Sequence, residues 1–370
     1  MKKITKYLLF IMIALLFVGC GKGKNKDENG VINEYNPEQN QNTPTLQPTI
    51  SLEDTVIEPD ENHEGEIKST ISGLWLPEAM ENKRPLAIQF SNFKTVSNQW
   101  GLGQAQIVYE ALVEGGITRI LGIFDQVTGD RIGSIRSARH YFVSIADEYD
   151  AIYVHFGRTK YAVAKMKELG INHMDGQDGI GTTVFYRDNS MSAPHNAFTS
   201  LDRILEGIEK KDFVTVHEEN YESHYSFYDK DTDLVSDTNV NKVTIDFSSY
   251  TAPYLEYNSV DKLYYRYQFG APHVDSNTKE QLTFKNIIVQ FVKEWNIDKN
   301  GYQTMDIEDA SGTGYYITNG KMVPITWKKK EQTRWMRYYN EAGEELTINP
   351  GKTYITLFPN NRTEDVIIEN

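Results

Sequence analysis

The chain has 370 residues but only one cysteine, Cys20. A lone thiol forms no internal disulfide and no cysteine zinc site, and acylation would remove it as a nucleophile. The sequence also lacks an HExxH pair, a GxSxG elbow and a GxxxxGK[ST] phosphate loop. These absences exclude the common zinc-protease, serine-hydrolase and P-loop mechanisms, and stability must come from a buried core.

Positive charge is also in short supply, because 38 Lys and Arg stand against 52 Asp and Glu, giving a formal net charge of −14. Such a chain is poorly suited to bind nucleic acid, and we expect no nucleic-acid partner. The eight histidines are scattered, and we expect no metal and no cofactor. Asp229, Asp231 and Asp233 begin like a calcium loop but lack its later glycine and glutamate, which favours an acidic surface turn.

The N-terminus has the layout of a lipoprotein signal peptide. Three lysines within the first six residues precede an apolar stretch, residues 7–18, which ends at Gly19-Cys20. This pattern predicts a signal over residues 1–19 that is removed, with Cys20 carrying the lipid (palmitate). Phe17 stands where leucine is commonest, and an uncleaved anchor helix is the alternative. Either way, we expect the chain to be held at the cell membrane on its extracytoplasmic face.

Composition divides the remainder into three parts. Residues 20–72 are polar and rich in Asn, Gln, Pro and Thr, which predicts the lipidated cysteine followed by a flexible, disordered tether. Residues 73–215 predict a mixed α/β domain, and residues 216–370 predict a mostly antiparallel β-rich domain. The expected fold class is α+β.

Apolar periodicity and turn residues give the expected elements of both parts. In the first part we expect strands at 86–90, 107–114, 117–125 and 151–156, and helices at 138–148, 160–169 and 201–211. Gly115-Gly116 predicts a hairpin turn, Gly170 a helix end, and the pair Thr199 and Asp202 a capping box. In the second part we expect strands at 242–247, 262–269, 284–292, 314–318, 333–339 and 353–357.

The first part also carries charged and polar side chains within apolar sequence. Two arginines spaced by small residues stand where a helix should begin, so Ser137 and the free amides of its first turn are predicted to hold an anion that the arginines grip. Buried charges are costly unless they are paired, which favours one shared polar pocket. The candidate ligand-binding residues are Glu110, Glu114, Arg119, Arg136, Ser137, Arg139, His140, His155, His195 and Asn196.

Each candidate also has a structural explanation. Glu110 and Glu114 are equally well explained as partners of Arg119 across the hairpin. The two arginines after it are equally well explained as braces between helix and sheet. His155 is more simply a packed core residue, and His195 a side chain that locks its loop.

Several longer motifs resemble those of the YerB family of bacterial lipoproteins. They are RPLAI at 84–88, IVYE at 107–110, EGGITR at 114–119, IGSIRSAR at 132–139, YDAIYVH at 149–155 and APHN at 193–196, with SGTG, VPITWK and NPGKT in the second half. The likeness runs from about residue 74 to the C-terminus. It implies a tethered, two-domain extracytoplasmic protein of Gram-positive-type bacteria, and it implies no reaction.

The sequence favours a binding or regulatory module of the cell envelope that recognises an anionic ligand or a protein partner. A wall polymer or an envelope protein would be that partner, with the membrane contacted through the lipid. The alternative is a wall-active hydrolase or transferase that uses the carboxylates and histidines of the first part. A purely structural spacer and solute capture for a transporter rank below these two.

Overall fold

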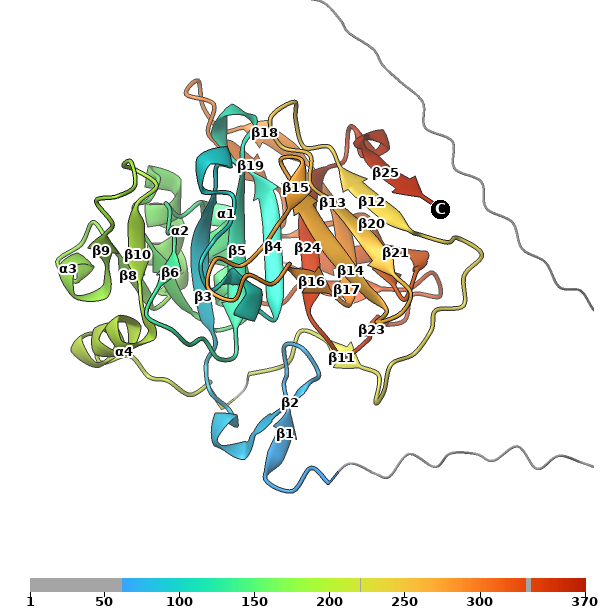
Figure 1. Ribbon diagram of the computed structural model, residues 1–370, viewed down its shortest axis with the longest axis horizontal. Helices are drawn as coiled ribbons and strands as arrows, with labels where there is room; N and C mark the ends of the chain where they lie inside the picture. Colours follow the sequence, from blue (N-terminus) through green and yellow to red (C-terminus); the bar gives the residue numbers. More distant parts are fainter. Residues whose placement is uncertain (1–61, 220, 331–333) are drawn as a thin grey trace, which may run out of the picture. The chain divides into compact units, whose positions relative to one another are not determined.

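The computed structural model describes residues 62–219, 221–330 and 334–370 (Figure 1). The predicted signal peptide, Cys20 and the tether up to residue 61 lie outside the described residues. Among the residues it describes, no helix combines the length and the apolar character needed to cross a membrane.

A ten-stranded mixed sheet runs through both halves of the sequence. The two halves join where β24, from the C-terminal end, pairs in parallel with β4 on one side and with β17 on the other. Figure 1 shows this junction as red β24 beside cyan β4. In sheet order the strands are β22 (Arg337–Tyr339), β21 (Lys321–Lys329), β20 (Ala310–Thr318), β17 (Asn286–Val292), β24 (Thr353–Pro359), β4 (Ile107–Leu112), β5 (Thr118–Phe124), β3 (Leu86–Asn92), β7 (Ile152–His155) and β8 (His173–Asp175).

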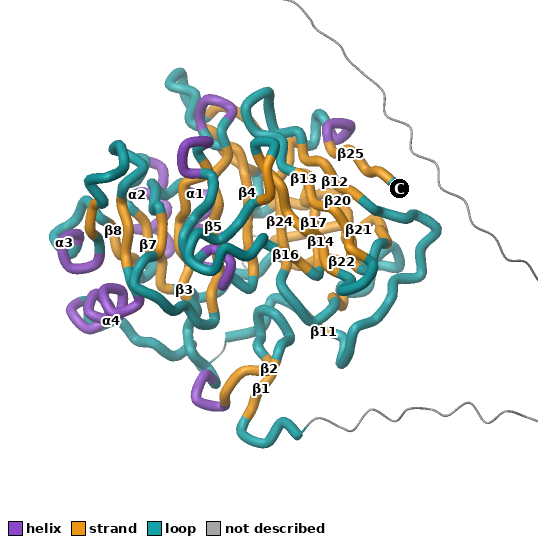
Figure 2. Tube along the Cα trace, viewed as in Figure 1, coloured by secondary structure: helices purple, strands orange, loops and turns teal. Residues whose placement is uncertain are grey.

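The helices belong to the first half. Figure 2 shows α2, α3 and α4 in purple around the end of the sheet formed by β7 and β8. Helix α1 packs against α2. The helices are α1 (His140–Glu148), α2 (Lys160–Leu169), α3 (Gly181–Val184) and α4 (Leu201–Lys210). Short 3-10 turns are η1 (Glu78–Met80), η2 (Lys94–Val96), η3 (Leu102–Gln104), η4 (Glu114–Gly116) and η5 (Thr363–Asp365).

A second, antiparallel sheet comes from the C-terminal half. Its order is β15 (Ala271–Pro272), β14 (Leu263–Gln268), β13 (Tyr254–Asn258), β12 (Lys242–Ile245) and β25 (Val366–Glu369), with β16 (Thr283–Phe284) also paired to β14. The smaller sheets contain β1 (Glu66–Lys68) with β2 (Trp75–Pro77), β6 (Ile132–Gly133) with β10 (Ala197–Thr199) and β9 (Tyr186–Arg187), β11 (Ser226–Phe227) with β23 (Thr347–Ile348), and β18 (Glu294–Asn296) with β19 (Gln303–Met305).

The core is continuous across the two sheets, because buried residues of both belong to one apolar cluster. Every residue of β4, β5, β17 and β24 is buried. Runs such as TRILGIF in β5 are apolar or β-branched at nearly every position, as expected for strands covered on both faces.

The α+β fold class is confirmed, with helices and mixed pairing in the first half and mainly antiparallel strands in the second. The hairpin at Gly115-Gly116 joins β4 to antiparallel β5, and α2 has the predicted bounds. Gly170 ends α2 in the left-handed conformation, with φ of 66°. The strands of both halves share the ten-stranded sheet, and the second half also forms the antiparallel sheet.

Two expectations need correction, and two strands were missed. The tether was expected to reach residue 72, but β1 starts at Glu66, and Ile71 and Ser72 are buried. Helix α4 is capped by Ser200, whose hydroxyl accepts a hydrogen bond from the Arg203 amide, and not by a box at Thr199. The patterns also missed β13 and β25.

Candidate functional site

Three arginines of the first half lie together, and we call Arg119, Arg136 and Arg139 the arginine cluster. Arg119 lies in β5, and the other two lie in the segment that leads from β6 into α1. The main chain of this segment is held between strands: the Arg136 amide donates to the Gln89 carbonyl at 2.9 Å, and the Phe156 amide donates to the Arg136 carbonyl at 3.0 Å. The sheet therefore positions the cluster.

The turn between β4 and β5 brings one carboxylate, Glu114, to this cluster. Gly115 and Gly116 follow it with φ of 74° and 72°, a conformation that glycine adopts without steric cost. Ser248 of the second half donates its hydroxyl hydrogen to the Gly116 carbonyl. The orientation of Glu114 is thus determined by two glycines and supported by a contact from the other half.

Among the residues that the structure describes, Glu114 forms an ion pair with Arg139 alone. The Arg139 Nε donates to Glu114 Oε1 at 2.8 Å, and its second nitrogen donates to the other oxygen, which makes a bidentate ion pair. Burial would raise the pKa of Glu114, but the hydrogen bonds and charge of Arg139 outweigh it, so this pKa lies below its ordinary value. A carboxylate held in its ionised form is a poor general acid.

Arg119 is the most buried member of the cluster, with 3% of its surface exposed. One terminal nitrogen donates to the Ser137 carbonyl at 2.6 Å, and its Nε has no hydrogen-bond partner among the described residues. Burial, together with the charges of Arg139 and Arg136, lowers the pKa of Arg119 well below its ordinary value. Arginine nevertheless stays protonated in proteins, so this is a buried cation without a carboxylate partner in the described chain.

Arg136 also has no carboxylate partner in the part of the chain that the structure describes. Its guanidinium donates only to the Pro194 carbonyl, at 3.3 Å. His195 lies beside it, with Nδ1 3.0 Å from the Ser91 hydroxyl and its ring stacked on Phe93 at 4.6 Å between centroids. Burial and the charges of Arg136 and Arg119 lower the pKa of His195 to about 4, so this ring is neutral at pH 7.

Five of the ten candidate residues therefore gather in one place: Glu114, Arg119, Arg136, Arg139 and His195. Three guanidinium groups and one carboxylate lie there, and because only Arg139 is paired with that carboxylate among the described residues, an excess of two positive charges remains. The N-cap of α1 is Arg139, and no side chain caps the first amides of this helix. The arrangement is electropositive within a chain that is acidic overall.

Glu110 belongs to a different network. Its carboxylate is fully buried and pairs with Arg266 of β14 at 2.6 Å, and it accepts hydrogen bonds from Asn92, Thr118 and Tyr354. The interpretation of Glu110 as the partner of Arg119 is therefore wrong. The true partner comes from the other half of the chain.

The remaining candidates are also dispersed. The Ser137 hydroxyl donates to the Phe156 carbonyl at 3.2 Å, so it does not cap α1. His140 is 2.6 Å from the Thr304 hydroxyl, and Asn196 accepts a hydrogen bond from Arg187 at 2.6 Å. Each of these three side chains contacts a neighbour outside the cluster.

His155 is buried in a group of its own. Its Nδ1 is 2.9 Å from the Gly157 carbonyl and its Nε2 is 3.1 Å from His173, while Asp175 lies 3.7 Å away. Burial lowers the pKa of His155 despite the nearby carboxylate. This geometry is that of a packed histidine with both ring nitrogens engaged.

Sequence reasoning missed Arg266, His273 and Gln99. Arg266 donates to the Glu110 carboxylate and contacts His273, and His273 in turn contacts Gln99. A signal for Arg266 was present, because β14 alternates strictly and Arg266 shares the buried face with Tyr264 and Gln268. Because a buried charge is costly unless it is paired, this position favoured a carboxylate partner for Arg266.

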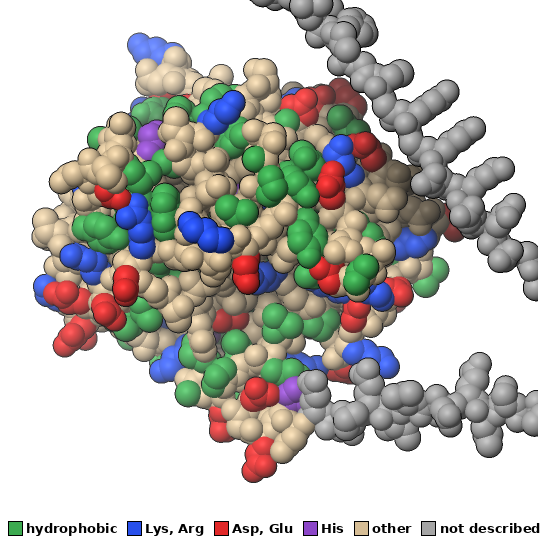
Figure 3. Space-filling view, viewed as in Figure 1, with side chains coloured by type: hydrophobic (Ala, Val, Ile, Leu, Met, Phe, Trp, Pro, Cys, Tyr) green, Lys and Arg blue, Asp and Glu red, His purple; other side chains and the backbone are tan. Residues whose placement is uncertain are grey.

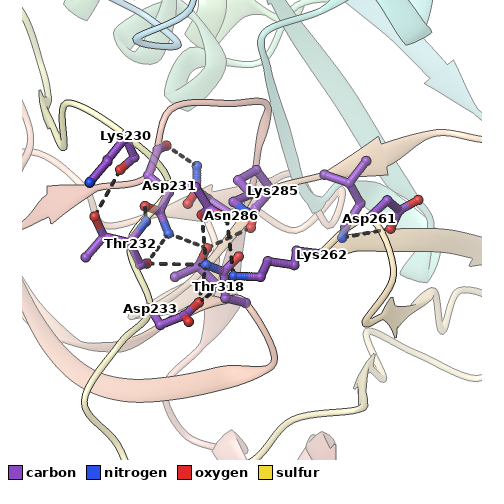
Figure 4. A network of polar contacts seen from close by, with 12 residues as sticks. Lys230, Asp231, Thr232, Asp233, Asp261, Lys262, Lys285, Asn286 and Thr318 are labelled. Carbon is purple, nitrogen blue, oxygen red and sulfur yellow. Dashed lines mark hydrogen bonds and ion pairs between the residues drawn. The ribbon is translucent and has the colours of Figure 1, made fainter. Parts of the chain in front are cut away.

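The acidic turn at residues 229–233 ties a loop to the sheet. Asp231 pairs with Lys285 at 2.7 Å, and Asp233 pairs with Lys262 at 3.0 Å (Figure 4). Asn319 donates to both carboxylates, at 2.8 and 2.7 Å. These aspartates neutralise lysines in this network.

The fold and the arginine cluster describe an α+β protein whose two halves share one sheet, with an electropositive site in the first half. Two family models match it: the N-terminal domain of a protein of unknown function (DUF3048) over residues 71–214, and the C-terminal domain of the same protein over residues 243–355. A Bacillus subtilis (strain 168) protein named "Putative lipoprotein YerB" is 30% identical over 296 residues, which are 79% of this chain and 86% of that protein.

The crystal structure of the YerB protein from Bacillus subtilis is also similar, with a TM-score of 0.72 and 28% identity over 82% of this chain and 100% of that one. The chain therefore belongs to the DUF3048 family. It is also a relative of YerB, which confirms the resemblance indicated by its motifs.

Proposed function

We propose that this protein is a lipid-anchored binding module of the cell envelope that recognises an anionic group at the arginine cluster. The observation that carries the proposal is Arg119, which is 3% exposed, has an unpartnered Nε and has no carboxylate partner among the described residues. A buried cation without a counter-ion costs several kcal/mol unless a ligand supplies the opposite charge.

The composition of the cluster indicates the chemistry of the ligand. Guanidinium groups bind phosphate and carboxylate oxygens in a bidentate manner, and Glu114 already occupies Arg139 in this way. Arg136, which is half-buried, remains available for a second anion, and the buried charge of Arg119 adds to the attraction. Acidic and basic side chains are interspersed on the face shown in Figure 3, so the attraction would be local to the cluster.

Binding is favoured over catalysis because the carboxylates are already engaged. Glu110 is buried against Arg266, and Glu114 is held ionised by Arg139. General acid–base catalysis requires a carboxyl group that is free to exchange a proton with a substrate. At this cluster, the described residues therefore provide no free carboxylate pair for the alternative function as a wall hydrolase.

The proposed location rests on the sequence and on the relative that carries the name of a lipoprotein. In this proposal Cys20 carries the lipid, the chain stays at the outer face of the membrane, and its partner is an envelope protein or a wall polymer. Cys20→Ser should release the protein from the membrane fraction into the medium. Retention of this variant in the membrane would contradict lipid anchoring.

The anion site is tested by thermal unfolding of the full-length protein in phosphate and in chloride at equal ionic strength. A ligand that binds only the native state raises Tm in a saturable manner. Phosphate should raise Tm of the wild type and of Lys167→Ala, which removes one exposed charge on α2. It should leave Tm of Arg136→Ala unchanged.

The same variant separates a binding role from a structural one. In chloride, Arg136→Ala should be as stable as the wild type or more so, because it loses one hydrogen bond but relieves repulsion from Arg139. A fall of several degrees in chloride, or a phosphate response that survives the substitution, would refute the proposal. Arg139→Ala should be less stable than the wild type, because it leaves the Glu114 carboxylate without its ion-pair partner.

A further inference from the structure

A cavity of about 400 Å³ lies between the two halves, away from the arginine cluster. The first half contributes η3, residues 105–106 and, beyond the end of β5, Gln126 and Thr128. The second half contributes the segment around β16 and Lys352. Its volume lies within the range of roughly 300–1,000 Å³ that is usual for small-molecule sites. Buried Leu102, Leu282 and Phe284 provide an apolar part of the wall.

Lys352 is the basic group of this cavity. Its ammonium donates to the Gly103 carbonyl and makes no ion pair within the described ranges. An ammonium carries three hydrogens, so two remain available to a ligand. Burial lowers the pKa of Lys352, although Asp275 and Glu280 act in the opposite direction.

Other lining groups have unused hydrogen-bonding capacity of both kinds. The Gln106 side chain accepts from the Asp125 amide at 2.8 Å, while its own NH₂ has no partner in the described chain. The Glu280 carboxylate and the Thr283 hydroxyl likewise make no hydrogen bond with described residues and line the cavity. Donors and acceptors are therefore mixed around one volume.

The charges of the cavity limit which ligands it accepts. Asp275 is already satisfied by the amides of Gly101 at 3.2 Å, Gly103 at 2.7 Å and Asn277 at 2.8 Å. Lys352 and the carboxylate of Glu280 then oppose each other, so neither a strong anion nor a strong cation gains much. A ligand with many groups that both donate and accept fits this wall best, and hydroxyl groups do both.

We propose that this cavity binds a neutral polyhydroxylated ligand, namely a short oligosaccharide that bridges the two halves. The apolar wall would face the carbon–hydrogen side of a sugar ring, while Lys352, Gln106 and Glu280 bind its hydroxyls. This site is independent of the arginine cluster, and either one can fail without the other.

The test uses saturation-transfer NMR and calorimetry on the full-length protein with maltotriose and with triacetylchitotriose. At least one of these neutral sugars should bind saturably. Its dissociation constant should rise about tenfold in Lys352→Met and in Glu280→Ala. Lys279→Met is the matched control, since Lys279 is a neighbouring lysine outside the cavity lining, and it should bind as the wild type does.

Glu280 is exposed, so Glu280→Ala tests the site even if the lysine variant folds poorly. Absence of saturable transfer from both sugars at their solubility limit would overturn the proposal. So would sugar binding that both cavity variants leave unchanged, or displacement of the sugar by glycine or by inorganic phosphate. Displacement by glycine would assign the cavity to zwitterions, and displacement by phosphate would assign it to anions.

Discussion

The buried ion pair between Glu110 and Arg266 joins the two halves of the chain and offers the sharpest test of the fold. Both side chains have no exposed surface, and the joined atoms lie 2.6 Å apart. Glu110 also accepts hydrogen bonds from Asn92, Thr118 and Tyr354, so protein groups surround both oxygens of its carboxylate.

Glu110→Gln keeps the shape of the side chain but removes its charge, leaving Arg266 buried without a carboxylate. Loss of one partner of a buried pair costs about 3–5 kcal/mol, because the remaining charge is uncompensated. We expect this loss in the free energy of unfolding from urea titration, and a similar loss for Arg266→Met. Such a cost is a large part of the total stability of about 5–15 kcal/mol.

The double variant distinguishes this explanation from general damage. With both charges removed, the penalty for an unpaired charge disappears, so the double variant should be more stable than the sum of the single losses predicts, by about 2 kcal/mol or more. The exposed pair of Lys242 and Glu369, 2.8 Å apart, is the matched control and should show a coupling below about 1 kcal/mol. Additive losses at Glu110 and Arg266 would refute the reasoning.

Two further predictions concern pH and packing. Burial raises the pKa of Asp125 to about 6, above the value of about 3.9 in an unfolded chain, so its contribution to stability is present below about pH 4 and lost as the pH rises through 6. Asp125→Asn should therefore be more stable than the wild type at pH 7 by up to about 3 kcal/mol in urea titrations, with no advantage at pH 4. Gly207→Ala should lower Tm, because its Cβ would lie 2.5 Å from Met174 Sδ and from a Val184 methyl.

Each of these two predictions has an outcome that would contradict it. An Asp125→Asn variant whose stability tracks that of the wild type from pH 4 to 7 would mean that the carboxyl titrates normally. In an exposed helix, Gly→Ala stabilises by about 1 kcal/mol, so a rise in Tm for Gly207→Ala would show that α4 does not pack closely on its neighbours. Glu206→Ala, on the exposed side of α4, should change Tm little.

Local signals predicted the elements that they control. Helix α2 has its predicted bounds because Thr159 caps its start and Gly170 ends it, both within a few residues of the helix itself. The hairpin after β4 follows from two adjacent glycines for the same reason. Strands of two or three residues, such as β15 and β18, carry no period and are defined by their partners alone.

Partners of charged residues were predicted less well. The carboxylate of Glu114 and the guanidinium of Arg139 are 25 positions apart, and the sequence only suggested that they share a pocket. Arg119, nine positions away, was one predicted partner of Glu110, whereas its partner in the structure, Arg266, is 156 positions away. Five of the ten candidate residues lie together, and the other five contact partners outside the arginine cluster.

The sequence alone determined the α+β class, the family, the two-glycine hairpin and the concentration of charge in the first half, because each is encoded in residues close together in the chain. Only the tertiary structure decided that β24 joins the two halves in one sheet and which charges remain without a partner. Those outcomes depend on strand order and register, which bring together residues more than a hundred positions apart.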